Sequence, residues 1–164
     1  MTTSNFLFQT LDAELIVVQA DIGSRKKLLE EMARLLTIPL NRDVNLEEDG
    51  ELTKEKDIYL QLWEREKLGN TGIGNGVALP HSRCPQASKA IVAIITLKDA
   101  VDYDSLDRQP VNVAFGLLVP TEATQDHLNL LADIARMMSD NQHKAEVADA
   151  ASAQDIIRLI GDWS

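Results

Sequence analysis

A histidine that directly follows a proline is the residue in this sequence best suited to do chemistry. His81 comes after Pro80, at the end of the short apolar run Val77-Ala78-Leu79. Neutral imidazole is a good nucleophile near pH 7 and can form a covalent intermediate, for example by accepting a phosphoryl group on nitrogen. A Pro-His pair on its own is more often a turn without chemistry, so the case for His81 depends on the residues around it.

Three alternating glycines precede this histidine, at positions 72, 74 and 76. Glycine permits positive φ angles and a close approach of other groups to the backbone. The spacing differs from the dinucleotide fingerprint, which needs G-x-G-x-x-G between a strand and a helix, and no Gly-Lys-Ser/Thr nucleotide phosphate loop is present. We therefore expect no nucleotide or other cofactor, and we expect any phosphate handled here to arrive on another protein.

Two other residues could assist a nucleophilic histidine. His127 lies in the first turn of a predicted helix, where unpaired N–H groups and the positive end of the helix dipole favour a phosphoryl oxygen. Arg65 lies in the last turn of another predicted helix, and its planar guanidinium can hold phosphoryl oxygens in pairs. Simpler interpretations exist: a solvated first-turn residue for His127, and a charge that complements the helix C-terminus for Arg65.

The single cysteine and the remaining histidine give little support for a metal site. One thiol, Cys84, near a histidine is a weak metal signal, and His143 is most simply interpreted as an exposed loop residue. A lone cysteine cannot form an intramolecular disulfide. This favours a reducing compartment, so we expect a cytoplasmic protein without a bound metal.

The composition is that of an ordinary globular protein, with 45% hydrophobic and 26% charged residues in 164. This length predicts a single domain over residues 1–164. A formal net charge of -10 and only 4% aromatic residues argue against a nucleic-acid partner, which would require basic residues and stacking platforms. No apolar run approaches the roughly 20 residues that span a bilayer, and the N-terminal sequence does not resemble a signal peptide. We expect no direct membrane insertion.

The expected elements follow from hydrophobic periodicity and from helix-capping residues. Two apolar, β-branched runs at 90–97 and 111–119 are typical of strands that are covered on both faces, and 16–18 predicts a shorter strand. Helices are predicted at 25–36 with Ser24 as N-cap, at 53–68 with Gly69 as its stop, at 125–139, and after Ser152. The predicted class is α/β, with a sheet sandwiched between helical layers.

Two further expectations concern particular segments. The predicted helix 125–139 carries apolar residues at core spacing, namely Leu128, Leu131, Ile134, Ala135 and Met138. The acidic stretch from 41 to 51 predicts an exposed loop, to which we assign no function.

Three motifs resemble the enzyme IIA family of the sugar phosphotransferase system, of the fructose/mannitol type. They are Arg-Glu-Lys-Leu-Gly at 65–69, Thr-Gly-Ile-Gly-Asn-Gly-Val-Ala-Leu-Pro-His at 71–81, and Gln-Pro-Val at 109–111 leading to Leu-Leu-Val-Pro at 117–120. The similarity covers nearly the whole chain, and the second motif is too long to be a chance match. One departure is Ser82, where the family usually has glycine.

The resemblance implies roles for individual residues. His81 would accept a phosphoryl group from the phosphohistidine of an HPr-like carrier, usually on Nε2, with His127 as the second histidine and Arg65 as the active-site arginine. It also implies a mixed sheet of about five strands between helices.

Within this family, the Thr-Gly-Ile-Gly-Asn-Gly form and the segment 104–111 resemble the nitrogen-related branch. That branch implies a regulator whose phosphorylation state changes its binding to target proteins, such as potassium-uptake components or sensor kinases. The first alternative is a sugar-specific carrier for fructose or mannitol. The second is a protein-binding module whose histidine is never phosphorylated.

Overall fold

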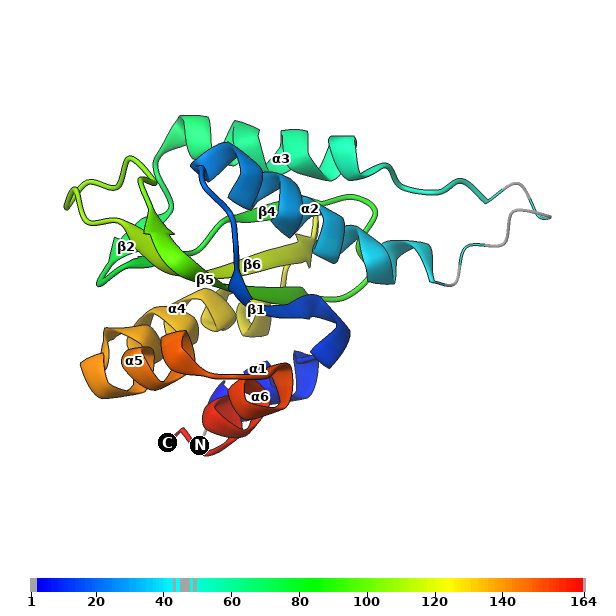
Figure 1. The fold of residues 1–164 in the computed structure, drawn as a ribbon. Helices are drawn as coiled ribbons and strands as arrows, with labels where there is room; N and C mark the ends of the chain where they lie inside the picture. The colour runs from blue at the N-terminus through cyan, green and yellow to red at the C-terminus, as the bar shows by residue number, and fades with distance from the viewer. Residues whose placement is uncertain (1–2, 43, 45–47, 49, 164) are drawn as a thin grey trace.

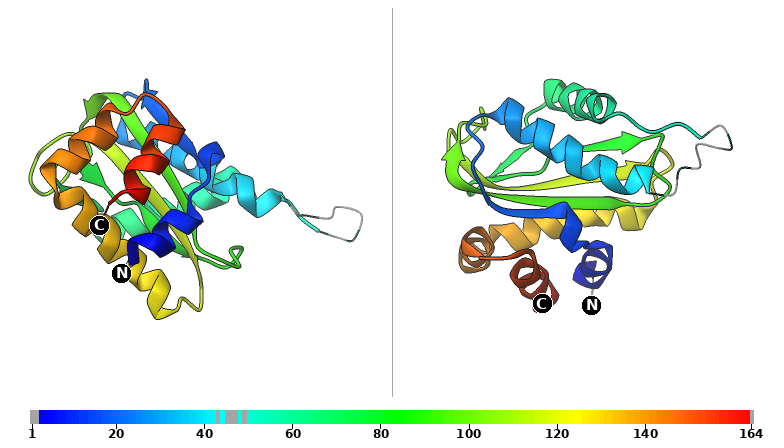
Figure 2. Two further views of the ribbon diagram at one scale, coloured as in Figure 1. Left: turned by 90° about the horizontal axis from the view of Figure 1, so that it is seen from below. Right: turned by 45° about the vertical axis from the view of Figure 1, so that its right-hand side comes forward.

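A mixed β-sheet lies between two layers of helices (Figure 1). The computed structural model describes residues 3–42, 44, 48 and 50–163. One face of the sheet is covered by α2 (Arg25–Asn41) and α3 (Glu55–Leu68). The other face is covered by α1 (Thr3–Thr10), α4 (Gln125–Ser139), α5 (Asn141–Asp149) and α6 (Ala153–Gly161), as the right-hand view of Figure 2 shows. The predicted α/β sandwich is confirmed.

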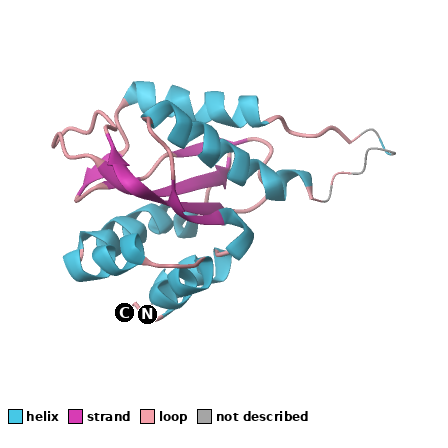
Figure 3. Ribbon diagram, in the orientation of Figure 1, coloured by secondary structure: helices cyan, strands magenta, loops and turns pink. Residues whose placement is uncertain are grey.

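Figure 3 shows the sheet enclosed by the helices. Within the described part of the chain the sheet has six strands. They are β1 (Ile16–Ala20), β2 (Gly72–Gly74), β3 (Val77–Ala78), β4 (His81–Cys84), β5 (Ile91–Val101) and β6 (Val111–Pro120). Their order is β1-β5-β6-β3-β2, and β4 also pairs with β6. The long strands β5 and β6 are antiparallel, whereas β1 pairs with β5, and β3 and β4 pair with β6, in parallel.

The two strands β3 and β4 are one strand interrupted by two residues. Ala78 pairs with Ala114 and His81 pairs with Leu117, so the offset along β6 is the same on both sides of the interruption. Proline has no N–H to donate to a ladder, which accounts for the break at Leu79–Pro80. Counting the interrupted strand once gives the five strands expected, and counting its two parts gives six.

Separate apolar cores lie on the two faces of the sheet. On the face covered by α2 and α3, the helix residues Leu28, Leu36 and Leu62 are completely buried against the sheet. The predicted caps are confirmed: Ser24 accepts a hydrogen bond from the Lys27 N–H, and Gly69 caps α3. The helix α2 continues beyond its predicted end at residue 36, because Ile38 and Leu40 pack against the same core.

Two of the predictions are wrong. Leu128 was expected in the core but is 46% exposed, because α4 turns Leu130, Ile134, Met137 and Met138 toward the sheet instead. His143 was expected in an exposed loop but is buried in α5, with its ring centroid 4.8 Å from that of Trp163. Helices as short as α1 and α5 are marginal in isolation and form here by packing, so their sequences give little local signal.

Three further expectations concern the acidic stretch, membrane spans and the number of domains. In the acidic stretch 41–51, residues 43, 45–47 and 49 lie outside the described part of the chain, while Glu48 and Glu51 are exposed. No helix within the described residues combines the length and the apolar character needed to cross a membrane. That residues 1–164 form a single domain stays a prediction.

The packing of α2 on β6 gives a test of the fold. A Cβ atom at Gly116 would lie 2.5 Å from Met32 Cγ and would overlap the Sδ atom, and Met32 is completely buried. Gly116→Ala should therefore lower the free energy of unfolding by about 1–3 kcal/mol in denaturant titrations. The control is Gly23→Ala, since nothing lies within 4 Å of the added Cβ and its stability should not fall. An unchanged stability of Gly116→Ala would contradict the close packing of α2 on β6.

Candidate functional site

A pocket of about 680 Å³ lies where α3, β4, the end of β6 and the start of α4 meet. It contains all three residues that the sequence predicted: Arg65 from α3, His81 from β4 and His127 from α4. The structure thus brings together side chains from three separate elements. The other lining residues are Leu60, Gln61, Glu64, Leu68, Ser82, Arg83, Leu117, Val119, Ala123, Leu128 and Leu131.

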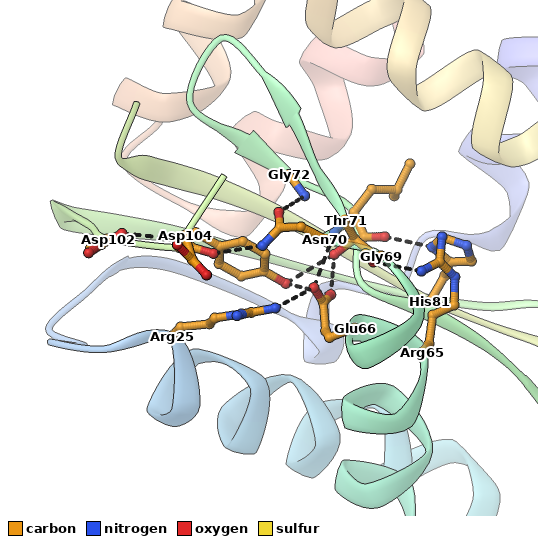
Figure 4. Close-up of polar contacts among 12 residues, drawn as sticks. Arg25, Arg65, Glu66, Gly69, Asn70, Thr71, Gly72, His81, Asp102 and Asp104 are labelled. Atoms are coloured by element: carbon orange, nitrogen blue, oxygen red, sulfur yellow. Dashed lines mark hydrogen bonds and ion pairs between the residues drawn. The ribbon is translucent and has the colours of Figure 1, made fainter. Parts of the chain in front are cut away.

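The orientation of His81 is set by a hydrogen bond to the backbone. Its Nδ1 lies 2.7 Å from the carbonyl oxygen of Leu79, and Figure 4 shows this contact beside Arg65. A carbonyl oxygen can only accept, so Nδ1 carries the hydrogen in the neutral ring. The lone pair is then on Nε2, the nitrogen that a reacting group in the pocket could use.

The surroundings of His81 favour its neutral form. Burial lowers the pKa of the His81 imidazole below its ordinary value, and the positive charge of Arg65 lowers it further. The hydrogen bond to Leu79 and the charge of Glu66 act in the opposite direction. The net lowering of the pKa keeps the imidazole neutral near pH 7, the state in which it is a nucleophile.

His127 has the opposite tautomer. Its Nδ1 accepts a hydrogen bond of 3.1 Å from the backbone N–H of Thr124, which caps the first turn of α4. The hydrogen of the neutral ring is therefore on Nε2. The pocket thus combines a lone pair on His81 with an N–H donor on His127. Phe6 of α1 lies next to this ring, with 6.3 Å between the two centroids.

Arg65 is held at the C-terminal end of α3. Its Nη1 donates a hydrogen bond of 2.7 Å to the carbonyl oxygen of Gly69, the residue that caps the helix. This bond agrees with the simpler interpretation of Arg65 as a C-terminal charge. The two interpretations are compatible, because a guanidinium has five N–H groups and the same side chain lines the pocket.

A second arginine of the pocket was missed by the sequence analysis. Arg83 follows His81 by two residues in β4, so the two side chains project from the same face of that strand. Its Nη1 donates to the carbonyl oxygen of Thr121 at 2.7 Å, much as Arg65 is held by Gly69. Had β4 been predicted, the two-residue spacing from His81 would have identified Arg83.

A buried carboxylate, Glu66, lies behind the pocket. It accepts hydrogen bonds from Arg25 Nη2 at 2.9 Å, from the Thr71 N–H at 3.1 Å, from the Thr71 hydroxyl, and from the Tyr103 hydroxyl at 2.8 Å (Figure 4). Burial and the charge of Glu66 raise the pKa of Tyr103, so its hydroxyl stays protonated and donates. The sequence signal for Glu66 was its position four residues after the buried Leu62, on the core face of α3.

Neither Cys84 nor His143 takes part in the site. Cys84 is buried, its thiol donates to Gln86 Oε1 at 3.2 Å, and burial raises its pKa. His143 packs against Trp163 in the other helical layer. No group of three or more His, Cys, Asp or Glu side chains that could hold a metal is found among the residues that the structure describes.

Comparison with known sequences identifies one family. The family model described as phosphoenolpyruvate-dependent sugar phosphotransferase system, EIIA 2, matches residues 9–163. A nitrogen regulatory protein of Pseudomonas aeruginosa is 36% identical over 156 residues, which cover 95% of each chain. A fructose-specific EIIA component of the phosphotransferase system from Haloferax volcanii is 30% identical over 120 residues, which cover 73% of this chain and 78% of the relative.

Solved structures of IIA proteins also resemble this chain. The nitrogen regulatory protein IIA-Ntr of Neisseria meningitidis has a TM-score of 0.82 at 32% identity, and the match covers 94% of this chain and 99% of that one. The mannitol IIA of Escherichia coli has a TM-score of 0.71 at 16% identity, with 92% and 98% covered. The second similarity concerns the fold alone.

The lowered pKa of His81 predicts a specific response to pH and to loss of Arg65. NMR titration should show the His81 imidazole protonating below the ordinary value of 6.5. In Arg65→Gln its pKa should rise, because a positive charge that disfavours the imidazolium is removed. Arg34→Gln, which alters an exposed arginine paired with Glu31 on α2, should leave the titration unchanged. A wild-type pKa at or above 6.5 would show that the ring is not buried as described.

Proposed function

This chain belongs to the EIIA 2 family of the phosphoenolpyruvate-dependent sugar phosphotransferase system, and we propose that it is a histidine phosphocarrier with His81 as the acceptor. The observation that carries the proposal is the Nδ1–H tautomer of His81, which leaves the Nε2 lone pair for the pocket. That pocket also contains a second histidine and two arginines.

The reaction needs no group beyond two histidines. The Nε2 lone pair of His81 forms a new N–P bond while the N–P bond of a donor phosphohistidine breaks. The electron pair of the broken bond returns to the donor imidazole, and the proton on His81 Nδ1 stays in place. Such transfers depend on positioning and on electrostatic stabilisation more than on covalent assistance. We propose an HPr-like phosphocarrier protein as the donor.

The other charged and polar groups of the pocket would bind the phosphoryl oxygens. Arg65 and Arg83 each have one nitrogen anchored by a carbonyl oxygen, which holds the guanidinium in position before the donor arrives. His127 would add a hydrogen bond from its Nε2–H, as its tautomer supports. Preorganised donors of this kind stabilise the charge that spreads over the transferring group.

Exposed leucines around the pocket support docking of a protein partner. Leu60 is 43% exposed, Leu68 is 86% exposed and Leu128 is 46% exposed, and all three line the pocket. Exposed apolar side chains grouped around polar residues are typical of protein interaction sites. This would explain why Leu128 is not in the core: it would be covered by the donor protein.

For the biological role we propose phosphorylation-dependent regulation in the nitrogen-related branch of the system. The relatives named nitrogen regulatory protein, at 36% and 32% identity, support this branch. A phosphoryl group carries about −1.5 to −2 charges near pH 7 and would offset the positive charge of the two arginines in the pocket. Target proteins such as potassium-uptake components or sensor kinases would then distinguish the two forms. Such a regulator would act in the cytoplasm.

Phosphotransfer can be tested directly by mass spectrometry. Incubation with phosphoenolpyruvate, enzyme I and an HPr-like protein should add one acid-labile phosphoryl group to the wild-type chain and none to His81→Ala. His143→Phe is the matched control, because His143 lies in the other helical layer, and it should be modified as the wild type is. No modification of the wild type by any competent donor would contradict the phosphocarrier proposal and favour the binding module.

The proposed phosphate-binding role of Arg83 predicts a kinetic defect. Hydrogen bonds to charged groups contribute about 1.5–3 kcal/mol, so Arg83→Ala should slow phosphotransfer about tenfold or more. Stopped-time assays of phosphoryl uptake would measure the rate. Arg34→Ala on α2 is the control and should react as the wild type does. Equal rates for both variants would remove Arg83 from the proposed site.

The sugar-transport alternative predicts a different destination for the phosphoryl group. The fructose-specific relative at 30% identity is the observation that supports this alternative. Rapid transfer from phosphorylated His81 to a sugar-specific IIB domain would favour transport. A change in target binding on phosphorylation, without onward transfer, would favour regulation.

A further inference from the structure

The backbone of Leu79 connects His81 to the loop that follows α3. Its carbonyl oxygen accepts from His81 Nδ1 at 2.7 Å, and its N–H donates to the carbonyl oxygen of Thr71 at 2.9 Å. Both groups point away from β6, because the carbonyl oxygens of Gly76 and Pro80 face β6 and backbone groups alternate sides along a strand. The position of the Leu79 carbonyl is therefore linked to the position of Thr71.

Thr71 is in turn held by Glu66. The carboxylate accepts from both the N–H and the hydroxyl of Thr71, and its side chain is fully buried. The neighbours of Thr71 are fixed as well: Asn70 Nδ2 donates to the Tyr103 carbonyl oxygen at 2.9 Å, and Asn70 Oδ1 accepts from the Gly72 N–H at 2.7 Å. Figure 4 shows Arg25, Glu66 and Thr71 close together, with Asn70 and Gly72 beside them.

We infer that Glu66 is a positioning residue for His81: acting through Thr71 and the Leu79 peptide, it holds the imidazole in the Nδ1–H tautomer with Nε2 directed at the pocket. The inference about tautomer and orientation stands on the hydrogen bonds alone. Its consequence for phosphotransfer rests on the proposed function.

Only a carboxylate satisfies this arrangement. Four donor groups converge on Glu66: a guanidinium N–H of Arg25, the N–H and hydroxyl of Thr71, and the hydroxyl of Tyr103. An ionised carboxylate only accepts and has about four lone-pair sites, whereas glutamine presents two N–H donors of its own. In Glu66→Gln, the amide N–H groups of glutamine would face the N–H and hydroxyl donors around them. Thr71 would then lose part of its hydrogen bonding.

A purely structural role for Glu66 is the competing explanation. A buried ion pair with Arg25 could serve only to anchor the end of α3. The two explanations differ in what they predict for the His81 ring, because a loss of stability alone does not change which nitrogen carries the hydrogen. The tautomer of His81 is therefore the decisive measurement.

We would record the ¹⁵N shifts of the His81 ring nitrogens well above the ordinary histidine pKa, in the wild type, Glu66→Gln and Ile160→Val. The wild type should show Nδ1–H and an unprotonated Nε2. Glu66→Gln should shift the equilibrium toward Nε2–H. Ile160→Val, a buried change in the other helical layer, should lose stability but keep the wild-type tautomer. An unchanged tautomer in folded Glu66→Gln would overturn the inference.

Tyr103→Phe is a second variant in case Glu66→Gln does not fold. It removes one donor to Glu66 while keeping the buried ring. A partial shift toward Nε2–H would support the inference, and a pure Nδ1–H signal would count against it.

Phosphotransfer rates add a readout that separates the two proposals. Glu66→Gln should accept a phosphoryl group about ten- to a hundredfold more slowly than the wild type, in keeping with the effect of small misplacements on positioned reactions. If the wild type accepts none, the proposed function fails while the tautomer measurement still decides the role of Glu66. A wild-type rate together with an altered tautomer would show that the tautomer does not limit transfer and would overturn the kinetic part.

Discussion

The site depends on the direction of the backbone groups along the strand that runs from β3 to β4. Successive residues of a strand direct their N–H and carbonyl groups to opposite sides, so only alternate residues bond to a given neighbouring strand. The Val113 and Leu117 N–H groups donate to the carbonyl oxygens of Gly76 and Pro80, so Leu79 faces away from β6 and its carbonyl oxygen can accept from the His81 ring. His81 is therefore fixed by the sheet through its backbone and by Leu79 through its ring. An open loop without pairing to β6 would not provide both constraints.

Charged side chains lie on both sides of the Leu79–Pro80 segment. The buried carboxylate of Glu66 lies on one side with Arg25 as its partner, and Arg65 and Arg83 line the pocket on the other. Moving ions out of water costs several kcal/mol each, so a buried carboxylate persists only where donors surround it closely. Glu66 belongs to α3, and its donors come from α2, from the loop after α3 and from the segment after β5. The same contacts that offset its burial thus tie these segments together. A chain with net charge of -10 in this way presents a locally basic pocket.

How far the sequence predicts this structure depends on whether the signal is local. The strands β5 and β6, the start of α2 and the whole of α4 follow from apolar runs and caps that a short window contains. The short elements α1, α5 and β4 form through packing and pairing with distant segments. A short stretch of sequence does not contain those contacts. Leu128 was misplaced because the apolar pattern of α4 fits two neighbouring faces. Family motifs located His81, His127 and Arg65, whereas Arg83 emerges only once β4 is paired with β6. The contacts of Glu66 emerge only once α2 and the segments after α3 and β5 are brought together.

The two tryptophans lie in opposite helical layers, with a consequence for spectroscopy. The guanidinium of Arg25 is 5.2 Å from the Trp63 ring, above the sheet, while the Trp163 ring packs against His143 below it. Indole emission responds to charge and polarity close to the ring, and these are the only tryptophans in the sequence. The chain therefore contains a built-in optical reporter on each side of the sheet, and replacing one indole would let fluorescence follow either layer alone without an attached dye.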